Sequence, residues 1–420
     1  MTRRYWVETL GCPKNQVDSD KLVGTLLADG LVPAASADEA DLVVVNTCAF
    51  IEAARQESID TVLALSDGRR DGAQIVVTGC MAERYGDELA DALPEVDLVA
   101  GFGVPVTLSA KVTTVAAPIP PPMDLLNLPR PRATAPWAYV KIAEGCDRSC
   151  GFCAIPSFRG PQRSRSVDEI LAEVEALGDG VREIVLVAQD LASYGKDVPG
   201  MGAGSIVPLV RAVSARVART RLLYLYPSDL SDELIDVIGA ESGVPYWDLS
   251  LQHVSKPLLR RMRRWGDGDR FLRRIEDIKR RYPEAAFRSN FIVGYPGETE
   301  ADHDLLLRFV EEAELDWVGF FSYSREEGTH AADLDGQVPA NLMHERLLEL
   351  GALQDDITSA RRRDLVGTTI EVLVDRPGTG RSHREAPEID GIVNVPSELT
   401  VGKLHKVTVT AAYGPDLVAE

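Results

Sequence analysis

Near the N-terminus, a short apolar run ends at a cysteine three times, and each time a stretch with helical periodicity follows. The apolar runs read YWVETLGC, ADLVVVNTC and AQIVVTGC, and they end at Cys12, Cys48 and Cys80. Short Val- and Ile-rich runs that alternate with amphipathic helices indicate a parallel sheet with helices on both faces. Ligands of such sheets bind beyond the carboxyl ends of the strands. We therefore expect the three cysteines to converge into a three-thiolate metal site; the alternative is that they are small buried apolar residues.

The other three cysteines lie together in the stretch GCDRSCGFCAIPSFRG, with the spacing C-x3-C-x2-C. A chain of 420 residues, 45% of them hydrophobic, can bury sizeable cores and needs no disulfide framework. Cys146, Cys150 and Cys153 are therefore candidate metal ligands. A structural zinc site normally has four protein ligands, whereas three ligands leave one iron of an iron–sulfur cluster open for a small molecule. Zinc binding and a purely structural role are the alternatives.

This motif, with the aromatic Phe152 just before its last cysteine, resembles the signature of radical S-adenosylmethionine enzymes. The resemblance implies that Cys146, Cys150 and Cys153 are catalytic and hold a 4Fe–4S cluster whose open iron binds S-adenosylmethionine. An electron from the cluster would then cleave the cofactor and release a 5′-deoxyadenosyl radical. Phe152 would be part of the cofactor-binding site.

A segment with seven prolines separates the two cysteine groups. Proline fits neither a helix interior nor a central strand, so this segment is predicted to be an extended linker. We predict four parts. An N-terminal domain covers residues 1–117 and would bind a cluster through the first three cysteines, and the linker covers 118–136. A core covers 137–364, and a small domain covers 365–420.

In the core, strand-like runs alternate with helix-like stretches. Six such units are fewer than the eight of a closed barrel, so we expect an α/β fold with an open or partial (β/α)6 barrel. The cysteine loop directly follows the first of these strands, at the end where such barrels place active sites. The strand-like runs cover residues 139–142, 184–188, 222–226, 247–251, 287–293 and 317–322.

After a helix predicted over 341–364, the runs TTIEVLVD, DGIVNVP and LHKVTVTAAYG predict a small antiparallel barrel. Residues 366–420 contain five Lys and Arg against eight Asp and Glu, and the whole chain carries a formal charge of −20. The C-terminal module therefore lacks the excess positive charge that nucleic-acid binding normally uses. An acidic protein suits a basic protein partner better.

The N-terminal stretch MTRRYWVETLGC contains no apolar signal core, and the sequence has no apolar run long enough for a membrane helix. We expect a cytoplasmic protein without membrane contact, in which the thiols stay reduced. A monomer is the expected state.

The whole layout resembles the methylthiotransferase family of radical-SAM enzymes, which has an N-terminal three-cysteine domain, a radical-SAM core and a C-terminal TRAM domain. One branch modifies an adenosine of transfer RNA, and another modifies an aspartate of a ribosomal protein. Pro13-Lys14 and the REEGT motif favour the ribosomal-protein branch, because the transfer-RNA branch typically has Gln-Met and an Arg-Pro before Gly-Thr at these places. The segments that look like the ribosomal-protein branch are LGCPKNQVDSDKL, NTCAFIEAARQESID, TGCMAERYGDEL, GCDRSCGFCAIPSFRGPQRSR, LYPSDLSDELI, DLSLQHVS, FIVGYPGETEAD and FFSYSREEGTHAA.

This resemblance implies that a methylthio group is added to the β-carbon of an aspartate in the small-subunit ribosomal protein numbered twelve. It also implies two 4Fe–4S clusters, one on each cysteine triplet, with S-adenosylmethionine as radical source and methyl donor. An electron donor and a sulfur donor would be further partners. Two alternatives stay open: a transfer-RNA methylthiotransferase, and a non-catalytic iron–sulfur or zinc scaffold in ribosome assembly.

Five further residues at predicted strand ends are candidates for contact with cofactor or substrate. Gly294 and Gly297 in IVGYPGE would let the backbone approach the adenosyl group, or they form a plain turn. His253 in SLQH could equally be structural. Gln189 and Asp190 in LVAQD face the same predicted mouth, and the alternative for them is a helix cap.

The stretch from Arg260 to Arg281 holds ten Arg and Lys against four Asp and Glu and is the only strongly basic one. It could steer ribosomal RNA near the substrate. A solvated helix face is the interpretation we favour.

Overall fold

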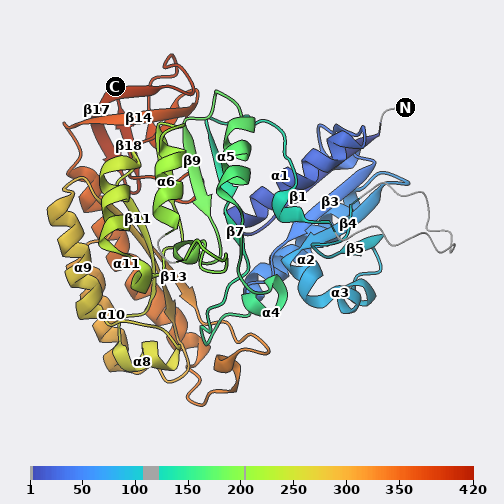
Figure 1. Cartoon of the computed structure of the whole chain (residues 1–420). Helices are drawn as coiled ribbons and strands as arrows, with labels where there is room; N and C mark the ends of the chain where they lie inside the picture. The colour runs from blue at the N-terminus through green and yellow to red at the C-terminus, as the bar shows by residue number, and fades with distance from the viewer. Residues whose placement is uncertain (1–2, 107–122, 203–204) are drawn as a thin grey trace. The chain divides into compact units, whose positions relative to one another are not determined.

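The computed structural model describes residues 3–106, 123–202 and 205–420, which form two compact units (Figure 1). The first unit contains the chain up to Arg132, together with Glu144–Asp147 and Cys153–Pro161. The second contains the rest of the described residues. Residues 118–122 of the predicted linker lie outside the described residues.

The first unit is built on a five-stranded sheet with the order β2-β1-β3-β4-β5, and all its neighbouring strands run parallel. The predicted parallel sheet is confirmed. Strand β3 is buried along its whole length, as is typical of a parallel sheet covered on both faces. The strands are β1 (Arg4–Thr9), β2 (Val32–Pro33), β3 (Leu42–Thr47), β4 (Gln74–Gly79) and β5 (Leu98–Ala100).

Alternate residues of each strand point to opposite faces of this sheet, so both faces carry apolar side chains. Helices cover both faces. Leu42 and Val44 of β3 pack in one apolar cluster with α1. Val43 and Val45 pack in a second cluster with α2 and α3. The helices are α1 (Pro13–Ala28), α2 (Glu52–Gly68) and α3 (Cys80–Ala92), with a short 3-10 helix η1 (Ala37–Glu39) before β3.

The strand order gives this sheet a topological switch point between β1 and β3, since β2 lies beyond β1 and β4 lies beyond β3. Open α/β sheets bind ligands outside the carboxyl ends of the strands at such a point. Cys12 follows β1, Cys48 follows β3, and Cys80 is the first residue of the helix after β4. All three cysteines therefore lie at the carboxyl edge of three adjacent strands.

The described end of the predicted linker packs on the first unit. Its 3-10 helix η2 (Leu125–Asn127) buries Leu125 and Leu126, and Leu125 joins the apolar cluster that contains residues of α1. The ammonium group of Lys21 donates to the carbonyl of Leu126, and a Cβ at Gly24 would lie only 2.5 Å from the carbonyl oxygen of Pro129. This close approach explains why α1 has a glycine there.

The second unit contains six parallel strands in two groups, β10-β9-β6 and β11-β12-β13. A single parallel bridge between Leu225 and Leu249 joins the two groups. The predicted partial (β/α)6 barrel is confirmed. The strands are β6 (Trp137–Lys141), β9 (Glu183–Val187), β10 (Arg219–Leu222), β11 (Tyr246–Gln252), β12 (Ala286–Val293) and β13 (Trp317–Ser322).

The third barrel strand differs from the predicted one over residues 222–226. β10 begins at Arg219 and ends at Leu222, and Tyr224 then has a positive φ of 65°, which a regular strand cannot contain. The polar start of β10 concealed it, because Arg219 and Arg221 are buried by partners that are distant in sequence.

Helices cover the outside of this barrel, and their apolar residues join those of the strands in one large cluster. In α9, for example, Phe271, Ile275 and Ile278 are buried and the remaining side is charged. None of the helices in the described ranges is long and apolar enough to cross a lipid bilayer. The helices are α5 (Val167–Ala176), α6 (Ile206–Ser214), α7 (Asp232–Asp236), α8 (Lys256–Arg261), α9 (Gly268–Arg281), α10 (Glu300–Ala313) and α11 (Ala340–Arg363).

The C-terminal strands close into a small barrel with the order β14-β15-β16-β18-β17. Its pairs are antiparallel except β16 with β18, so the predicted antiparallel barrel is confirmed with one parallel exception. Sequence patterns missed β15 and β18, which are too short to show alternation. The strands are β14 (Thr369–Arg376), β15 (Thr379–Arg381), β16 (Val393–Asn394), β17 (Leu404–Tyr413) and β18 (Asp416–Ala419).

Buried ion pairs join this small barrel to the amino ends of the core strands. The carboxylate of Glu183, the first residue of β9, accepts from Arg221 Nε at 2.7 Å and from Arg381 Nη1 at 2.9 Å. Burial alone would raise the pKa of Glu183, but Arg221 and Arg381 lower it to about 2. Tyr246, at the start of β11, likewise donates to Asp390 at 2.7 Å. The C-terminal barrel thus packs at the end of the core opposite to the cysteine loop.

Replacing Glu183 with Gln is expected to destabilise the second unit by about 3–5 kcal/mol, because buried guanidinium groups would lose their carboxylate. The loss would be measured as a lower denaturation midpoint. Glu175→Gln is the matched control: its ion pair with Arg216 is exposed and should contribute less than about 1 kcal/mol. Equal stabilities of the two variants would contradict this account.

Candidate active site

The three N-terminal cysteines have thiol groups that influence one another. Cys48 and Cys80 are buried and Cys12 is half-buried. Burial raises the pKa of Cys48 to about 12, and negative charge at Cys12 and Cys80 contributes to the increase. Among the described residues, however, no three His, Cys, Asp or Glu side chains are arranged to hold a metal ion, so the three-thiolate site stays a prediction.

Asn15 connects the strand ends that carry these cysteines. Its side-chain amide nitrogen donates to the carbonyls of Leu10, after β1, at 2.9 Å and of Thr47, the last residue of β3, at 3.1 Å. Its side-chain oxygen lies 3.6 Å from the sulfur of Cys80. The fully buried Asn15 therefore links all three strand ends. Asn15 belongs to the stretch LGCPKNQVDSDKL, and the sequence analysis assigned no role to this residue.

Two glycines allow the backbone to come close to the cysteines. A Cβ at Gly11 would lie 2.9 Å from Cβ and 3.1 Å from Sγ of Cys48, and φ of this residue is +94°. A Cβ at Gly79, beside Cys80, would lie 2.2 Å from Oδ1 of Asn46. Side chains at these positions would push the cysteine loops apart.

A buried arginine from the second cysteine motif also reaches this group. Arg159 ends the short helix α4 (Ile155–Arg159), which begins two residues after Cys153 and belongs to the first unit. Its Nη2 lies 3.0 Å from the sulfur of Cys80 and donates to Oδ1 of Asn15 at 2.8 Å. The sequence analysis missed Arg159, although the residue stands in the quoted FRG motif.

The second cysteine motif is held at several points. In the first unit, the N–H of Cys146 donates to the carbonyl of Gly160 at 3.1 Å. In the second unit, the N–H of Gly151 donates to the carbonyl of Met262 at 2.8 Å. Phe152 packs against the barrel core. Cys146, Cys150 and Cys153 are all half-buried and free of disulfides, as open metal ligands must be.

A second arginine contacts a sulfur atom in this motif. Nη1 of Arg264 lies 3.2 Å from the sulfur of Cys150. The ring of Tyr226 lies between two guanidinium groups, with Arg264 at 4.2 Å and Arg148 at 4.0 Å from its centroid. Both distances are typical of cation–π contacts. The sequence analysis missed these three residues, because neither stacking nor pairing leaves a local pattern.

Asp190 pairs with Arg148, so its side chain does not serve as a helix cap. Its carboxylate accepts from Arg148 Nε at 2.5 Å and from Ser193 Oγ at 2.7 Å. It makes no capping bond to the 3-10 helix that follows, η3 (Leu191–Ser193). The helix-cap alternative is therefore wrong for Asp190. Gln189 is half-buried just beyond β9, and its role in cofactor binding stays a prediction.

His253 is fully buried directly after β11. Its Nδ1 accepts from the backbone N–H of Ser255 at 3.0 Å. Burial lowers the pKa of His253 to about 4, so the ring is neutral at neutral pH. The contact with Ser255 supports a structural role, while cofactor contact through Nε2 stays a prediction.

Gly294 and Gly297 both have positive φ, +81° and +87°. A Cβ at Gly294 would lie 2.2 Å from Sδ of Met343, and one at Gly297 would lie 3.0 Å from Nε of Arg261. The N–H of Gly297 donates to the carbonyl of Gly336 at 2.7 Å. Turn geometry and protein packing therefore account for both glycines, and approach to a cofactor stays a prediction.

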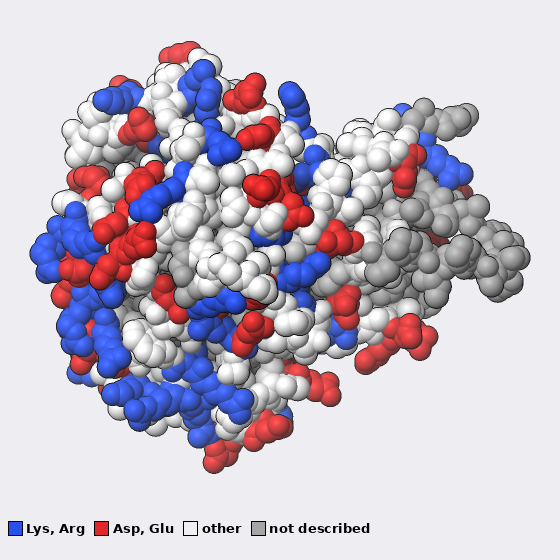
Figure 2. All heavy atoms as spheres, in the orientation of Figure 1, with Lys and Arg blue, Asp and Glu red and all other residues white. Residues whose placement is uncertain are grey.

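The basic stretch forms the charged side of α8 and α9, and Lys and Arg gather there on the molecular surface (Figure 2). Several of its arginines pair with nearby carboxylates: Arg274 with Asp232 at 2.7 Å, and Arg281 with Asp236. The pairing of these arginines with carboxylates supports the interpretation as a solvated helix face.

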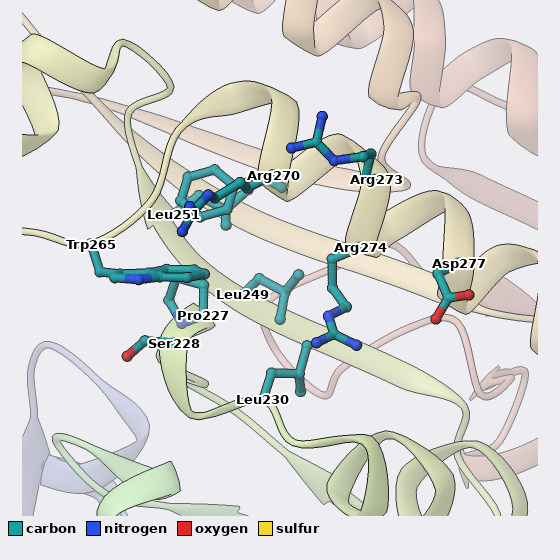
Figure 3. A pocket seen from close by; sticks show the side chains of 11 residues that line it. Pro227, Ser228, Leu230, Leu249, Leu251, Trp265, Arg270, Arg273, Arg274 and Asp277 are labelled. Atoms are coloured by element: carbon teal, nitrogen blue, oxygen red, sulfur yellow. The ribbon is translucent and has the colours of Figure 1, made fainter.

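A hollow of about 410 Å³ lies beside α9, and Trp265 is among the residues that line it (Figure 3).

Comparison with known proteins shows a three-part organisation. Residues 4–101 match the uncharacterized protein family UPF0004, residues 140–310 match the radical SAM superfamily, and residues 366–420 match the TRAM domain. Among solved structures, the radical S-adenosylmethionine methyltransferase TsrM from Kitasatospora setae has a similar fold. Its TM-score is 0.53 at 14% identity, over 79% of this chain and 77% of that one. The protein is thus a radical-SAM enzyme with a TRAM domain.

Full-length relatives define the family further. The chain is 41% identical to ribosomal protein uS12 methylthiotransferase RimO from Kineococcus radiotolerans, over 100% of this chain and 97% of the relative. It is 43% identical to the protein of the same name from Moorella thermoacetica, over 98% and 97%. The chain belongs to this family of methylthiotransferases.

Gly11→Ala is expected to prevent iron binding at the N-terminal cysteines, because the new methyl group would collide with Cys48. Gly72→Ala is the matched control, since Gly72 has a similar φ of +80° but no atom within 4 Å of the added Cβ. Both changes impose backbone strain of roughly 1–2 kcal/mol. Iron would be counted after anaerobic reconstitution. Iron retention by Gly11→Ala equal to that of Gly72→Ala would show that the close approach is unimportant.

Proposed function

We propose that this chain adds a methylthio group to the β-carbon of an aspartate in ribosomal protein uS12. The observation that carries the proposal is identity of 41–43% to uS12 methylthiotransferases over nearly the whole chain. These relatives also favour ribosomal protein over transfer RNA as the substrate. The six cysteines, in two triplets, would provide the ligands that two clusters require.

The β-carbon of an aspartate has no proton that an ordinary base removes efficiently, so radical chemistry suits this substrate. The cofactors, two 4Fe–4S clusters and S-adenosylmethionine, supply a carbon-centred radical, a sulfur atom and a methyl group. The protein must therefore hold two clusters, exclude water and position an aspartate side chain.

We infer a division of labour between the triplets. Cys146, Cys150 and Cys153 would hold the cluster that binds S-adenosylmethionine, while Cys12, Cys48 and Cys80 would hold an auxiliary cluster that carries sulfur. In the second unit, Arg148 pairs with Asp190 and Asp229, and Asp229 also accepts from Lys196 at 2.9 Å. Burial opposes the charge of Arg148, but Asp190 and Asp229 raise its pKa, so this residue stays cationic.

A three-way comparison tests this function. The parent enzyme, given S-adenosylmethionine, reductant and sulfide, should form 5′-deoxyadenosine and add the mass of a methylthio group to uS12. Cys48→Ala should still form 5′-deoxyadenosine but leave uS12 unthiolated, because only the sulfur-carrying site is disrupted. Cys150→Ala should do neither. The readouts are chromatography of the nucleoside and mass spectrometry of uS12 peptides.

Two outcomes would contradict the proposal. A parent enzyme that forms no 5′-deoxyadenosine would behave as a non-catalytic scaffold. Loss of 5′-deoxyadenosine in Cys48→Ala would argue against separate roles of the two triplets.

Further partners follow from the chemistry. A reductant must supply electrons and a sulfur donor must replace the transferred atom. The acidic chain, with a formal charge of −20, suits a basic ribosomal protein. We expect the enzyme to act as a monomer in the cytoplasm.

Substitutions on the basic side of α8 and α9 test whether RNA of the assembled ribosomal subunit contributes to substrate binding. Replacing Arg260, Arg270, Arg273 and Arg274 with Gln should leave the salt dependence of activity on assembled subunits unchanged if this is only a solvated face. Replacing Arg4, Arg70, Arg211 and Arg216, also on the surface, is the matched control. A flatter salt dependence for the first variant alone would assign RNA contact to this face.

A further inference from the structure

Arg159 is a buried cation in direct contact with a predicted cluster ligand. Only 3% of its side chain is exposed, and its Nη2 lies 3.0 Å from the sulfur of Cys80. Burying an arginine is costly unless its charge is paired and its N–H groups are bonded. The partners of Arg159 therefore show what this cation is placed to do.

The guanidinium group is held from several directions. Nη1 lies 3.0 Å from Oδ2 of Asp18 and 3.0 Å from the carboxylate of Glu144. Nη2 donates to Asn15 at 2.8 Å as well as facing Cys80, and the ring of Phe102 lies 4.2 Å from the guanidinium carbon.

A buried salt bridge alone does not require the contact with sulfur. The carboxylates of Asp18 and Glu144 already balance the charge of Arg159. Its Nη2 nevertheless faces the sulfur of Cys80 and donates to Asn15, whose side chain links the strand ends. Hydrogen bonds to cluster sulfur atoms and nearby positive charge favour the reduced, more negative state of an iron–sulfur cluster. Residues of this kind orient the ligand and tune the metal.

We propose that Arg159 is a positioning residue of the auxiliary site, which fixes Cys80 as a ligand and raises the reduction potential of the cluster bound there. This inference rests on the proposed function, because it requires a cluster on Cys12, Cys48 and Cys80. Since α4 begins shortly after Cys153, the same residue fixes the end of the catalytic motif against the auxiliary cysteines within the first unit.

The test uses the full chain with Cys146, Cys150 and Cys153 replaced by Ala, so that only the auxiliary cluster remains. Arg159→Gln and Arg159→Lys are added to this parent, and each protein is reconstituted anaerobically. Iron content is measured first, and the midpoint potential then follows from a redox titration monitored by electron paramagnetic resonance. We expect a more negative potential in Arg159→Gln and a smaller shift in Arg159→Lys, which keeps the charge but not the fork of donors.

Arg84→Gln is the matched control. Arg84 lies in the same unit, and its guanidinium carbon is 5.9 Å from the ring of Phe158. Its Nη1 donates to the carbonyl of Ala49 at 3.0 Å, whereas Arg159 faces a cysteine sulfur. The potential of this variant should equal that of the parent. Circular dichroism before reconstitution shows whether each variant is folded.

The outcomes separate the two proposals. Potentials of both Arg159 variants equal to that of the parent would overturn the role of Arg159 and leave the proposed function intact. If Arg159→Gln fails to fold, the potential of Arg159→Lys decides alone. A folded parent that binds no cluster would contradict the proposed function, and the inference with it.

Discussion

The first unit of this protein depends on one geometric property of parallel sheets: all strands end at the same edge. Cys12, Cys48 and Cys80 are far apart in sequence, yet each stands at the carboxyl end of its strand, around the switch point of the sheet. Asn15 then links these strand ends through its side-chain amide. The fold thereby places three cysteines at one edge of the sheet without a local metal-binding motif, and a three-thiolate site there stays a prediction.

Buried cations have a structural role in both units. Arg159 contacts the sulfur of Cys80 in the first unit, and Arg264 contacts the sulfur of Cys150 in the second. At the opposite end of the core, Arg221 and Arg381 share the carboxylate of Glu183. Burying a charged side chain is costly unless it is paired. Each of these buried arginines therefore depends on its carboxylate or sulfur partner, and losing that partner would be destabilising.

Much of the fold was predictable, because burial in parallel sheets leaves continuous apolar runs such as LVVVNT of β3. The same rule failed for β10, whose Arg219 and Arg221 are polar but buried by the distant C-terminal barrel. Short strands such as β15, with three residues, show no alternation and can be located only from their partners. Local pattern identifies elements that bury their own apolar side chains, and misses those stabilised by distant charge.

The site shows the same division. The cysteines were found because their spacing and their places after strands are visible in sequence. Asn15, Arg159 and Tyr226 were not assigned, since their roles arise from contacts between segments that are distant in sequence. For Gly294, the sequence analysis expected approach to a cofactor or a plain turn; in the structure its φ is +81°, and a Cβ there would collide with Met343.

Mössbauer spectroscopy on two complementary variants tests the central claim most directly. One variant keeps only Cys12, Cys48 and Cys80, and the other keeps only Cys146, Cys150 and Cys153. The account predicts that each folded variant, after anaerobic reconstitution, shows the spectrum of one 4Fe–4S cluster, and that the parent shows both. A folded N-terminal triplet that takes up no iron, or that binds zinc instead, would contradict it.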